Sequence, residues 1–431
     1  MSTKRHAVRR PSRRRRRLLR LRSLLVAVPA LAAGLLAVSL VGAALSPGNQ
    51  DFEAKWADWL RANHAGLLAQ KFEEIYYSAT APVKGGRPKG LNHVPGVETS
   101  AADATTTGSV GTTGPVATTA AQARSAPSTT APTTTLPTTT TTTRPPGLTA
   151  PSPVPLVVTP ALPGEGQWQA TGPLVDGRPA MYVAQFRADD VYTSQITSAV
   201  WIDTKLLRLG LVPGSTEPGG SWSHPPYVTS GELPNLVAAF NGGFRFQDAR
   251  GGIYLEGRWG VPPSPGAASF VLYKGGRVAI GAWGTDVSMT PDVVSVLQNV
   301  VLLVDHGQLA PSATYTDNAI WGYTLGGGYV VPRSGIGVTA DGALVYVAGP
   351  ALTAKSLAES LQRAGAVPAM TLDINPEWVT FNFYSHPAGQ PTNVSGAKLY
   401  PQMQRSADRY LPPGWEARDF YEVLLPGAPP A

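Results

Sequence analysis

Two side chains of opposite charge, Arg333 and Asp373, have the chemistry of a site that acts on an anionic substrate. The guanidinium of Arg333 is a planar fork that matches two phosphate oxygens. Asp373 follows the apolar run AMTL and emerges at the carboxyl end of an expected strand, where open α/β sheets place ligands, so it could act as a base or nucleophile. Each residue also has an ordinary structural interpretation: a salt bridge for Arg333 and a turn or cap for Asp373.

Further residues around this pair could contact a substrate. Asn241, Gly242 and Gly243 could present an amide and bare backbone to a sugar, or they could form a tight turn at a strand end. Glu377 supplies a second carboxylate four positions after Asp373, or it is a solvated loop residue. The weaker candidates are charged loop residues, a lone histidine and aromatic side chains that more often pack in a core: Glu256, Arg245, His386, Trp321, Trp378 and Tyr384.

A β-α-β unit is expected to position Asp373. It consists of a strand at 343–348, a helix at 354–364 and a strand at 367–372, whose two strands run parallel if they share a sheet. Thr353 is a good N-cap for the helix, and Gly365 is a good terminator. The sequence therefore predicts that Asp373 is held at the edge of a sheet.

The region from residue 166 to 426 alternates between apolar runs and turns, with few helical patterns. The sequence YKGGR at 273–277 predicts a hairpin with a Gly-Gly turn. We expect an α+β fold around a mixed β-sheet with few helices. Runs rich in β-branched and apolar residues predict further strands at 181–187, 197–203, 206–212, 236–240, 269–273, 277–282 and 300–304.

An ordered set of motifs resembles the phosphodiester glycosidase family. FNGGF at 240–244 is similar to the family's N-G-G-F-F, and RSGIG at 333–337 is similar to its R-T-A-I-G. The Asp-Gly turn at 341–342 and the helix that begins after Thr353 stand where the family has a D-G turn and a helix. AMTLD at 369–373 matches the approach to A-L-N-L-D-G-G-G-S. The resemblance covers residues 236–384.

This resemblance implies a hydrolase that cleaves a sugar–phosphodiester linkage, with Arg333 holding the phosphate and Asp373 acting on the anomeric centre. Such a reaction needs an anion site and at least one carboxyl group. One departure concerns residues 374–377, where this chain has INPE and the family has Gly-Gly-Gly-Ser. Ile374 and Pro376 do not let backbone amides approach a phosphate as glycines do. The alternative is therefore a catalytically inactive glycan-binding or structural envelope module on the same fold.

Several other functional classes lack their sequence signatures. The chain has six histidines and no cysteine, so it has no HExxH motif, no thiolate zinc site and no disulfide. There is also no repeated aspartate loop and no G-x-S-x-G nucleophile elbow. The sequence therefore predicts neither a metal nor a cofactor.

The net charge of +7 comes from one end of the chain. Residues 1–23 hold eleven Lys and Arg and no acidic residue, and removing them from the total of 35 leaves 24 basic against 28 acidic residues. A nucleic-acid binder needs a phosphate-neutralising surface on its folded part. We therefore expect no nucleic-acid partner and interpret residues 1–23 as a basic cytoplasmic segment.

Residues 24–45 form an uncharged apolar run long enough to cross a bilayer. Because the basic flank precedes this run, the positive-inside rule places the N-terminus in the cytoplasm and the rest outside. The sequence thus predicts a single-pass cell-membrane protein whose partners are the membrane and an envelope glycan or sugar-phosphate substrate. The alternative for 24–45 is a cleaved signal peptide, although its apolar segment is normally shorter.

Two segments are expected to connect this anchor to the outer domain at 166–426. Residues 46–95 contain an amphipathic helical pattern at 51–77 and then a turn-rich exit. The helix is expected to lie on the outer membrane surface or to pack against a partner or the outer domain. Residues 96–165 are rich in Thr, Pro, Ala and Ser, and such a composition predicts a disordered stalk.

Overall fold

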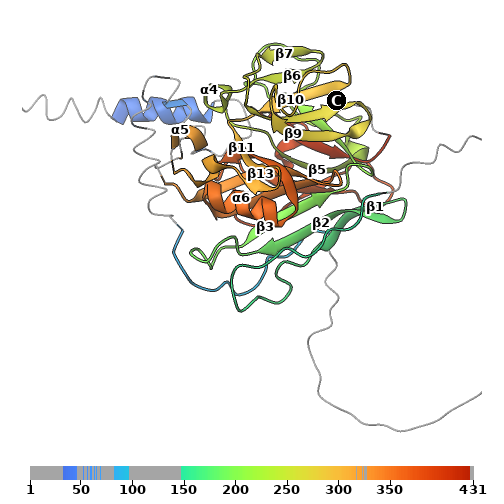
Figure 1. The fold of residues 1–431 in the computed structure, drawn as a ribbon. Helices are drawn as coiled ribbons and strands as arrows, with labels where there is room; N and C mark the ends of the chain where they lie inside the picture. Colours follow the sequence, from blue (N-terminus) through green and yellow to red (C-terminus); the bar gives the residue numbers. More distant parts are fainter. Residues whose placement is uncertain are drawn as a thin grey trace, which may run out of the picture. The chain divides into compact units, whose positions relative to one another are not determined.

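The computed structural model describes residues 33–45, 82–96, 147–316, 318–322 and 328–427, together with residues 52, 56, 59, 60, 63, 65, 68 and 324. Short helices are few and the described part is mostly β-sheet (Figure 1). Besides a helix at 33–44, the α-helices are α4 (Phe246–Ala249), α5 (Asn318–Trp321) and α6 (Ala354–Arg363). The 3-10 helices are η1 (Leu233–Asn235), η2 (Lys274–Gly276), η3 (Pro311–Thr314) and η5 (Ala407–Tyr410).

The largest sheet has eight strands in the order β1-β2-β3-β14-β13-β15-β11-β12. Its strands are β1 (Gln169–Val175), β2 (Arg178–Phe186), β3 (Thr197–Ile202), β11 (Leu302–Asp305), β12 (Gln308–Leu309), β13 (Val331–Thr339), β14 (Leu344–Leu352) and β15 (Ala366–Ile374).

Two five-stranded sheets complete the β structure, in the orders β17-β16-β5-β18-β4 and β7-β6-β10-β8-β9. The first contains β4 (Arg208–Val212), β5 (Leu236–Asn241), β16 (Phe381–Ser385), β17 (Ser395–Lys398) and β18 (Phe420–Leu424). The second contains β6 (Ile253–Leu255), β7 (Arg258–Val261), β8 (Ala268–Tyr273), β9 (Val278–Ala282) and β10 (Val293–Gln298).

The central strands of the eight-stranded sheet are buried on both faces. On β14, Val345 and Val347 face the cluster that includes Leu357 and Leu361 of α6, while Tyr346 faces the core shared with the other two sheets. Figure 1 shows α6 lying against this sheet, and it contacts β13, β14, β15 and β11. Strands buried on both faces have continuous apolar sequences, so they are readily predicted from the sequence.

The predicted β-α-β unit is confirmed, but the prediction of a mixed sheet is wrong. β14 and β15 both pair antiparallel with β13, which lies between them, so they run parallel to each other without being neighbours. All pairings between the described strands are antiparallel. Thr353 caps α6 as predicted, and Gly365 follows the helix with φ at +99°. The expected hairpins form between β8 and β9 and between β13 and β14.

Residues 147–165 lie against the folded domain, although the sequence places them in the stalk. The backbone amide of Leu148 donates to Asp203 at 2.6 Å, and that of Val154 donates to the carbonyl of Gly166 at 2.8 Å. Buried Glu165 forms an ion pair with buried Arg187 at 2.7 Å. These polar contacts hold a proline-rich segment that lacks a regular apolar pattern. The rest of the expected stalk, residues 97–146, is outside the described residues.

The N-terminal predictions fall largely outside the described residues. Residues 33–44 are helical, and Trp56 donates its indole N–H to the hydroxyl of Ser39 at 3.0 Å. The ring of Trp59 lies against Gly42. These two indoles therefore contact the 33–44 helix, a contact that neither of the two interpretations of the pattern at 51–77 predicts. Within the described residues, no helix has both the length and the apolar character needed to cross a membrane.

Candidate active site

Asp373 is the penultimate residue of β15, at the end of the buried run that the sequence singled out. Its side chain is buried, with the residue 4% exposed. The backbone amide of Ile374 donates to one carboxylate oxygen at 2.7 Å, and Arg418 forms an ion pair with the other at 2.9 Å. The Asp373 carboxylate is therefore held at a strand end by an amide and a guanidinium.

Arg418 and Asp419 are contributed by the segment that leads directly into β18. Besides Asp373, Arg418 donates to the carbonyl of Gly243, and its guanidinium lies 4.7 Å from the Trp378 ring centre. Asp419 accepts from the amide of Gly243 at 3.3 Å through its carboxylate. Since β18 pairs with β5, the start of one strand meets the end of the other. We call Asp373, Arg418 and Asp419 the aspartate–arginine cluster.

Gly242 and Gly243 bring the backbone directly onto this cluster. The amide of Gly242 donates to the carbonyl of Asp419 at 3.0 Å, and a Cβ at Gly242 would overlap the Asp419 carboxylate. A Cβ at Gly243 would lie 3.4 Å from Cγ of Asn299, which is tight but not overlapping. Position 242 of the predicted N-G-G turn must therefore be glycine, because the Asp419 carboxylate occupies the space that a side chain would need.

Burial sets the protonation of both carboxylates. It raises the pKa of Asp373 to about 7, against the lowering effect of the Arg418 charge, and the nearby Asp419 raises it further. Burial likewise raises the pKa of Asp419 to about 7, with Arg418 again acting in the opposite direction. Carboxyl groups that titrate near neutrality are suited to general acid–base chemistry.

Three buried polar atoms beside Gly243 have no hydrogen-bond partner among the described residues. They are Nε of Arg418, Oδ1 of Asp419 and Oδ1 of Asn299. The amide nitrogen of Asn299 is engaged, since it donates to the carbonyls of Thr371 and Leu372. Because buried polar atoms are nearly always paired, these three mark where a polar ligand can bind. They offer one donor for an anion and two acceptors for hydroxyl groups.

Asn241 has a positioning role in this arrangement. Its side-chain oxygen accepts from the Tyr346 hydroxyl at 3.0 Å and from the Thr380 amide at 3.1 Å. Its side-chain nitrogen donates to Ser334 at 3.1 Å and to the carbonyl of Gly242 at 2.8 Å. The amide is therefore used to fix the N-G-G turn, and its hydrogen bonds all lie within the protein.

Arg333 lies opposite Ile374 in the pairing of β13 with β15, but its guanidinium has no described contact with the Asp373 carboxylate. Its guanidinium donates to three backbone carbonyls, those of Leu352, Tyr329 and Trp321, at 3.0, 3.1 and 3.5 Å. Burial lowers its pKa to about 10. Among the described residues, neither the predicted phosphate-holding geometry nor the salt bridge of the alternative interpretation is present at Arg333. The guanidinium bonds to the carbonyls of Tyr329 and of the last residues of β14 and α5, and Arg418 stands beside Asp373 in its place.

Glu377 is buried rather than solvated. It lies in the turn after β15, and its carboxylate is 3.8 Å from Arg405. In the same turn Asn375 has φ at +75°, a left-handed conformation that glycine favours and that asparagine tolerates better than most residues. The turn therefore keeps one glycine-like conformation where the family has glycines, while the Trp378 ring packs on Arg418.

Of the weaker candidates, Arg245 and Trp378 lie near the aspartate–arginine cluster, and Trp378 does so by packing on Arg418. Arg245 is close enough to lower the pKa of Asp373. The carboxylate of Glu256 accepts from the backbone amides of Ser223 and His224 and so fixes a separate loop. Three others have side chains that bond to a backbone carbonyl within the fold, which indicates structural roles: His386 with Leu233, Trp321 with Ser312 and Tyr384 with Ala407.

Sequence reasoning missed Arg418 and Asp419. A signal was present in the run EARDFYEVLL at 416–425, where charged residues lead directly into a strand of apolar residues. Glu416, Arg418, Asp419 and Glu422 in this run are all buried. Without a fold, however, charges before a strand are equally typical of a solvated turn.

Comparison with known families confirms the resemblance. The family model for phosphodiester glycosidases, which are hydrolases, matches residues 234–373, a segment that begins just before β5 and ends at Asp373. The match includes the N-G-G turn and stops before Arg418. No curated protein matches the sequence.

Two solved structures resemble this chain weakly. One is the catalytic domain of zebrafish N-acetylglucosamine-1-phosphodiester alpha-N-acetylglucosaminidase, auto-inhibited by its pro-peptide, with 17% identity and a TM-score of 0.37 over 60% of this chain and 87% of that one. The other is a hypothetical protein from Synechocystis, with 12% identity and a TM-score of 0.37 over 59% and 64%. These values are too low to transfer a function.

Proposed function

We propose that this protein hydrolyses a sugar–phosphodiester linkage in cell-envelope glycan and that the aspartate–arginine cluster is its reaction centre. The observation that carries the proposal is that Arg418 joins Asp373 to the carbonyl of Gly243, whose amide in turn donates to Asp419. The phosphodiester glycosidase match over residues 234–373 supports the reaction class independently of this geometry.

Arg418 supplies the charge that the leaving group needs. When the bond between the anomeric carbon and the phosphate oxygen breaks, negative charge grows on the phosphate, which departs without needing a proton. The free Nε–H of Arg418 donates to a phosphate oxygen, and Arg245 adds a second positive charge nearby. A buried, prearranged donor acts strongly here because little water screens it.

The two carboxyl groups take the remaining roles. In its ionised form Asp373 acts on the anomeric centre, either by accepting the proton of the attacking water or by attacking the carbon itself. Asp419 and Asn299 each present a free oxygen, and these accept hydrogen bonds from sugar hydroxyls. Because both Asp pKa values are about 7, the ionised form of Asp373 is well populated only near or above neutral pH.

The proposal places this domain outside the cytoplasm on a membrane anchor. The supporting observations are the apolar run at 24–45, the basic segment that precedes it and the Thr/Pro-rich composition that follows. In this arrangement residues 97–146 act as a tether that lets the domain reach envelope glycan.

A glycan-binding module without activity is the second candidate. Two observations favour it: the aspartate–arginine cluster is almost fully buried and already paired, and INPE replaces the glycine-rich turn. In that case the free oxygens beside Gly243 would hold a sugar that is never cleaved.

Turnover separates the two candidates. The full chain is incubated with a panel of sugar-1-phosphate methyl diesters, and released sugar is measured alongside equilibrium binding. We expect release that Asp373→Asn lowers by at least about 10³-fold, as for loss of a group essential to catalysis. The matched control Asp292→Asn alters an exposed carboxylate that pairs with Arg277 and should leave the rate unchanged. Binding without release in the wild-type protein would establish the inactive module.

A further inference from the structure

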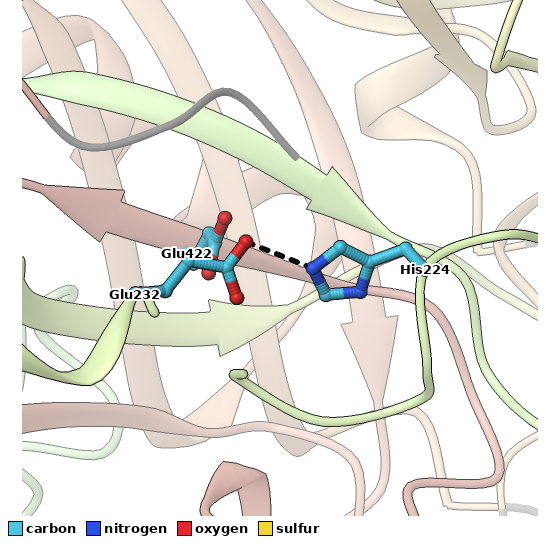
Figure 2. A group of neighbouring side chains, drawn as sticks. All are labelled: His224, Glu232 and Glu422. Carbon is cyan, nitrogen blue, oxygen red and sulfur yellow. Dashed lines mark hydrogen bonds and ion pairs between the residues drawn. The ribbon is translucent and has the colours of Figure 1, made fainter. Parts of the chain in front are cut away.

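A second cluster of titratable side chains lies on the five-stranded sheet that contains β18, separate from the aspartate–arginine cluster. His224 comes from the connection after β4, Glu232 precedes η1, and Glu422 lies on β18 (Figure 2). One ligand atom from each of the three residues lies within 4.8 Å of the others. We call these residues the His–Glu–Glu cluster.

The hydrogen bonds of His224 fix where its lone pair points. Nδ1 lies 2.7 Å from the carbonyl oxygen of Pro225, and a carbonyl cannot donate, so Nδ1 carries the proton. In the neutral ring, Nε2 then directs its lone pair at Oε1 of Glu232, 2.9 Å away. Two electron-rich atoms face each other, so either a proton or a cation must lie between them.

Glu422 strengthens the case for a cation. The residue is 0% exposed, and neither carboxylate oxygen has a hydrogen-bond partner among the described residues. A buried carboxyl group without a partner is costly in either protonation state. Figure 2 shows the Glu422 carboxylate beside that of Glu232 and close to the imidazole.

Hydrogen bonds from neighbouring residues orient Glu232 and His224, as is usual for metal ligands. The second oxygen of Glu232 accepts from the amide and hydroxyl of Thr229 at 2.7 and 2.6 Å. The carboxylate of Glu256 fixes the backbone of His224 through its amide at 3.0 Å. A metal-binding histidine typically donates its other ring N–H to a carbonyl or carboxylate, as His224 does to Pro225.

We propose that His224, Glu232 and Glu422 bind one divalent cation, with Zn²⁺ as the best match. One imidazole nitrogen and two carboxylate oxygens suit Zn²⁺ and leave one position for water. Bonds of about 2.0–2.1 Å in tetrahedral geometry separate ligand atoms by about 3.3 Å. Nε2 of His224 lies 2.9 Å from Oε1 of Glu232, and the ligand atoms of all three residues lie within 4.8 Å of one another, which is compatible with one shared ion. The His224 side chain is 10% exposed and provides a route for entry.

The cation would cross-link the connection between β4 and β5 to β18. Glu422 lies three residues after Asp419, so the ion would also stiffen the strand that begins at the aspartate–arginine cluster. The site does not depend on the proposed hydrolase activity, because none of its residues belongs to that cluster.

The test uses the untagged full chain, purified in detergent, stripped with a chelator and then titrated with Zn²⁺ alone. We expect one bound equivalent by elemental analysis and a melting temperature that rises by about 5–10 °C at a hundredfold excess over the dissociation constant. Glu422→Gln should lose the bound equivalent and the thermal shift. The matched control Glu359→Gln alters a carboxylate that pairs with Lys355 on the surface of α6 and should keep both.

The proposal fails if the wild-type chain binds no Zn²⁺, Mn²⁺ or Ca²⁺ at one equivalent, or if Glu422→Gln binds as the wild type does. Glu422 would then be a buried carboxylic acid. If Glu422→Gln does not fold, His224→Gln serves instead, because its side chain is partly exposed and tolerates change better. One equivalent of Mn²⁺ or Ca²⁺ that this variant loses would support the site with a different ion.

Discussion

The two buried clusters of charged side chains lie three residues apart along β18 and solve the same physical problem differently. In the aspartate–arginine cluster, Arg418 stands between two carboxyl groups and Arg245 acts on Asp373 from nearby. In the His–Glu–Glu cluster, two buried carboxyl groups share one imidazole, and Glu422 has no hydrogen-bond partner among the described residues.

The difference indicates which ligand each region selects. The aspartate–arginine cluster contains its own positive charge and keeps a free guanidinium N–H, so it can accept an anion. The His–Glu–Glu cluster contains two carboxyl groups and one imidazole but no Arg or Lys, so the ligand that we propose for it is a cation. Burial alone therefore does not reveal the role of an acidic residue, and its neighbours decide whether it serves catalysis or metal binding.

Among the substitutions that test this difference, replacing Arg418 should have the largest effect on activity and stability. Arg418→Met removes the positive charge from between Asp373 and Asp419 and the donor proposed for phosphate. We expect kcat/KM for a sugar-1-phosphodiester to fall by about 10³-fold and the free energy of unfolding to fall by about 3–5 kcal/mol. Steady-state kinetics and urea denaturation measure the two effects.

Arg333→Met is the matched control for this change, since it removes a buried guanidinium that donates only to backbone carbonyls among its described hydrogen bonds. It should lower stability while KM of the folded enzyme stays near the wild-type value. If KM rises more for Arg333→Met than for Arg418→Met, the phosphate binds at Arg333 and not at Arg418.

Adding a methyl group at Gly242 should have the next largest effect. In Gly242→Ala the new Cβ overlaps the Asp419 carboxylate, which must move, so we expect kcat to fall by about 10²-fold. Gly243→Ala places its Cβ 3.4 Å from Asn299 and should cost less, and Gly90→Ala adds a methyl group in open space. Equal rates for the three variants would show that the N-G-G turn does not shape the site.

The pH dependence of the rate should reveal the coupling between the two aspartates. Because ionised Asp373 is required and its pKa is about 7, kcat/KM should rise about tenfold per pH unit below pH 7 and then level off. Asp419→Asn removes a charge that raises this pKa, so the breakpoint should move to lower pH. If the breakpoint does not move, the Asp419 charge does not affect the pKa of the group whose ionisation controls the rate.

Stability should respond to pH in the direction set by the raised pKa values. In the folded protein Asp419 binds its proton up to about pH 7, whereas an unfolded aspartate loses it near pH 4. Its contribution to stability is therefore full below about pH 4 and is lost as pH rises to 7. Compared with the wild type, Asp419→Asn should gain up to about 1.4 kcal/mol per pH unit over this window. Denaturation at several pH values measures this difference.

The sequence predicted those features that depend on short segments. The apolar run before Asp373, the N-G-G turn and the cap of α6 were all visible, because each is encoded by consecutive residues. β13 was recognised as a motif and not as a strand, since its glycines obscure the pattern. A Cβ at Gly335 would overlap Leu361 of α6, and a Cβ at Gly337 would overlap Ala366, so both positions require glycine. Missing this central strand produced the incorrect mixed sheet.

The partners of each charged residue could not be predicted, since they are distant in sequence. Arg418 follows Asp373 by 45 residues and lies beyond the family match. Glu422 is far along the chain from His224, and no spacing rule connects them. Arg333 donates to backbone carbonyls, which carry no side-chain signature in the sequence. Such pairings follow from tertiary packing alone.

A crystal structure of the Asp373→Asn variant with an uncleaved sugar-1-phosphodiester would test the central claim most directly. The aspartate–arginine cluster predicts a phosphate oxygen within hydrogen-bonding distance of Arg418 Nε and the anomeric carbon next to the side chain at position 373. A phosphate bound at Arg333 or elsewhere on the surface, with the space beside Gly243 unchanged, would contradict the proposal that this cluster is the reaction centre.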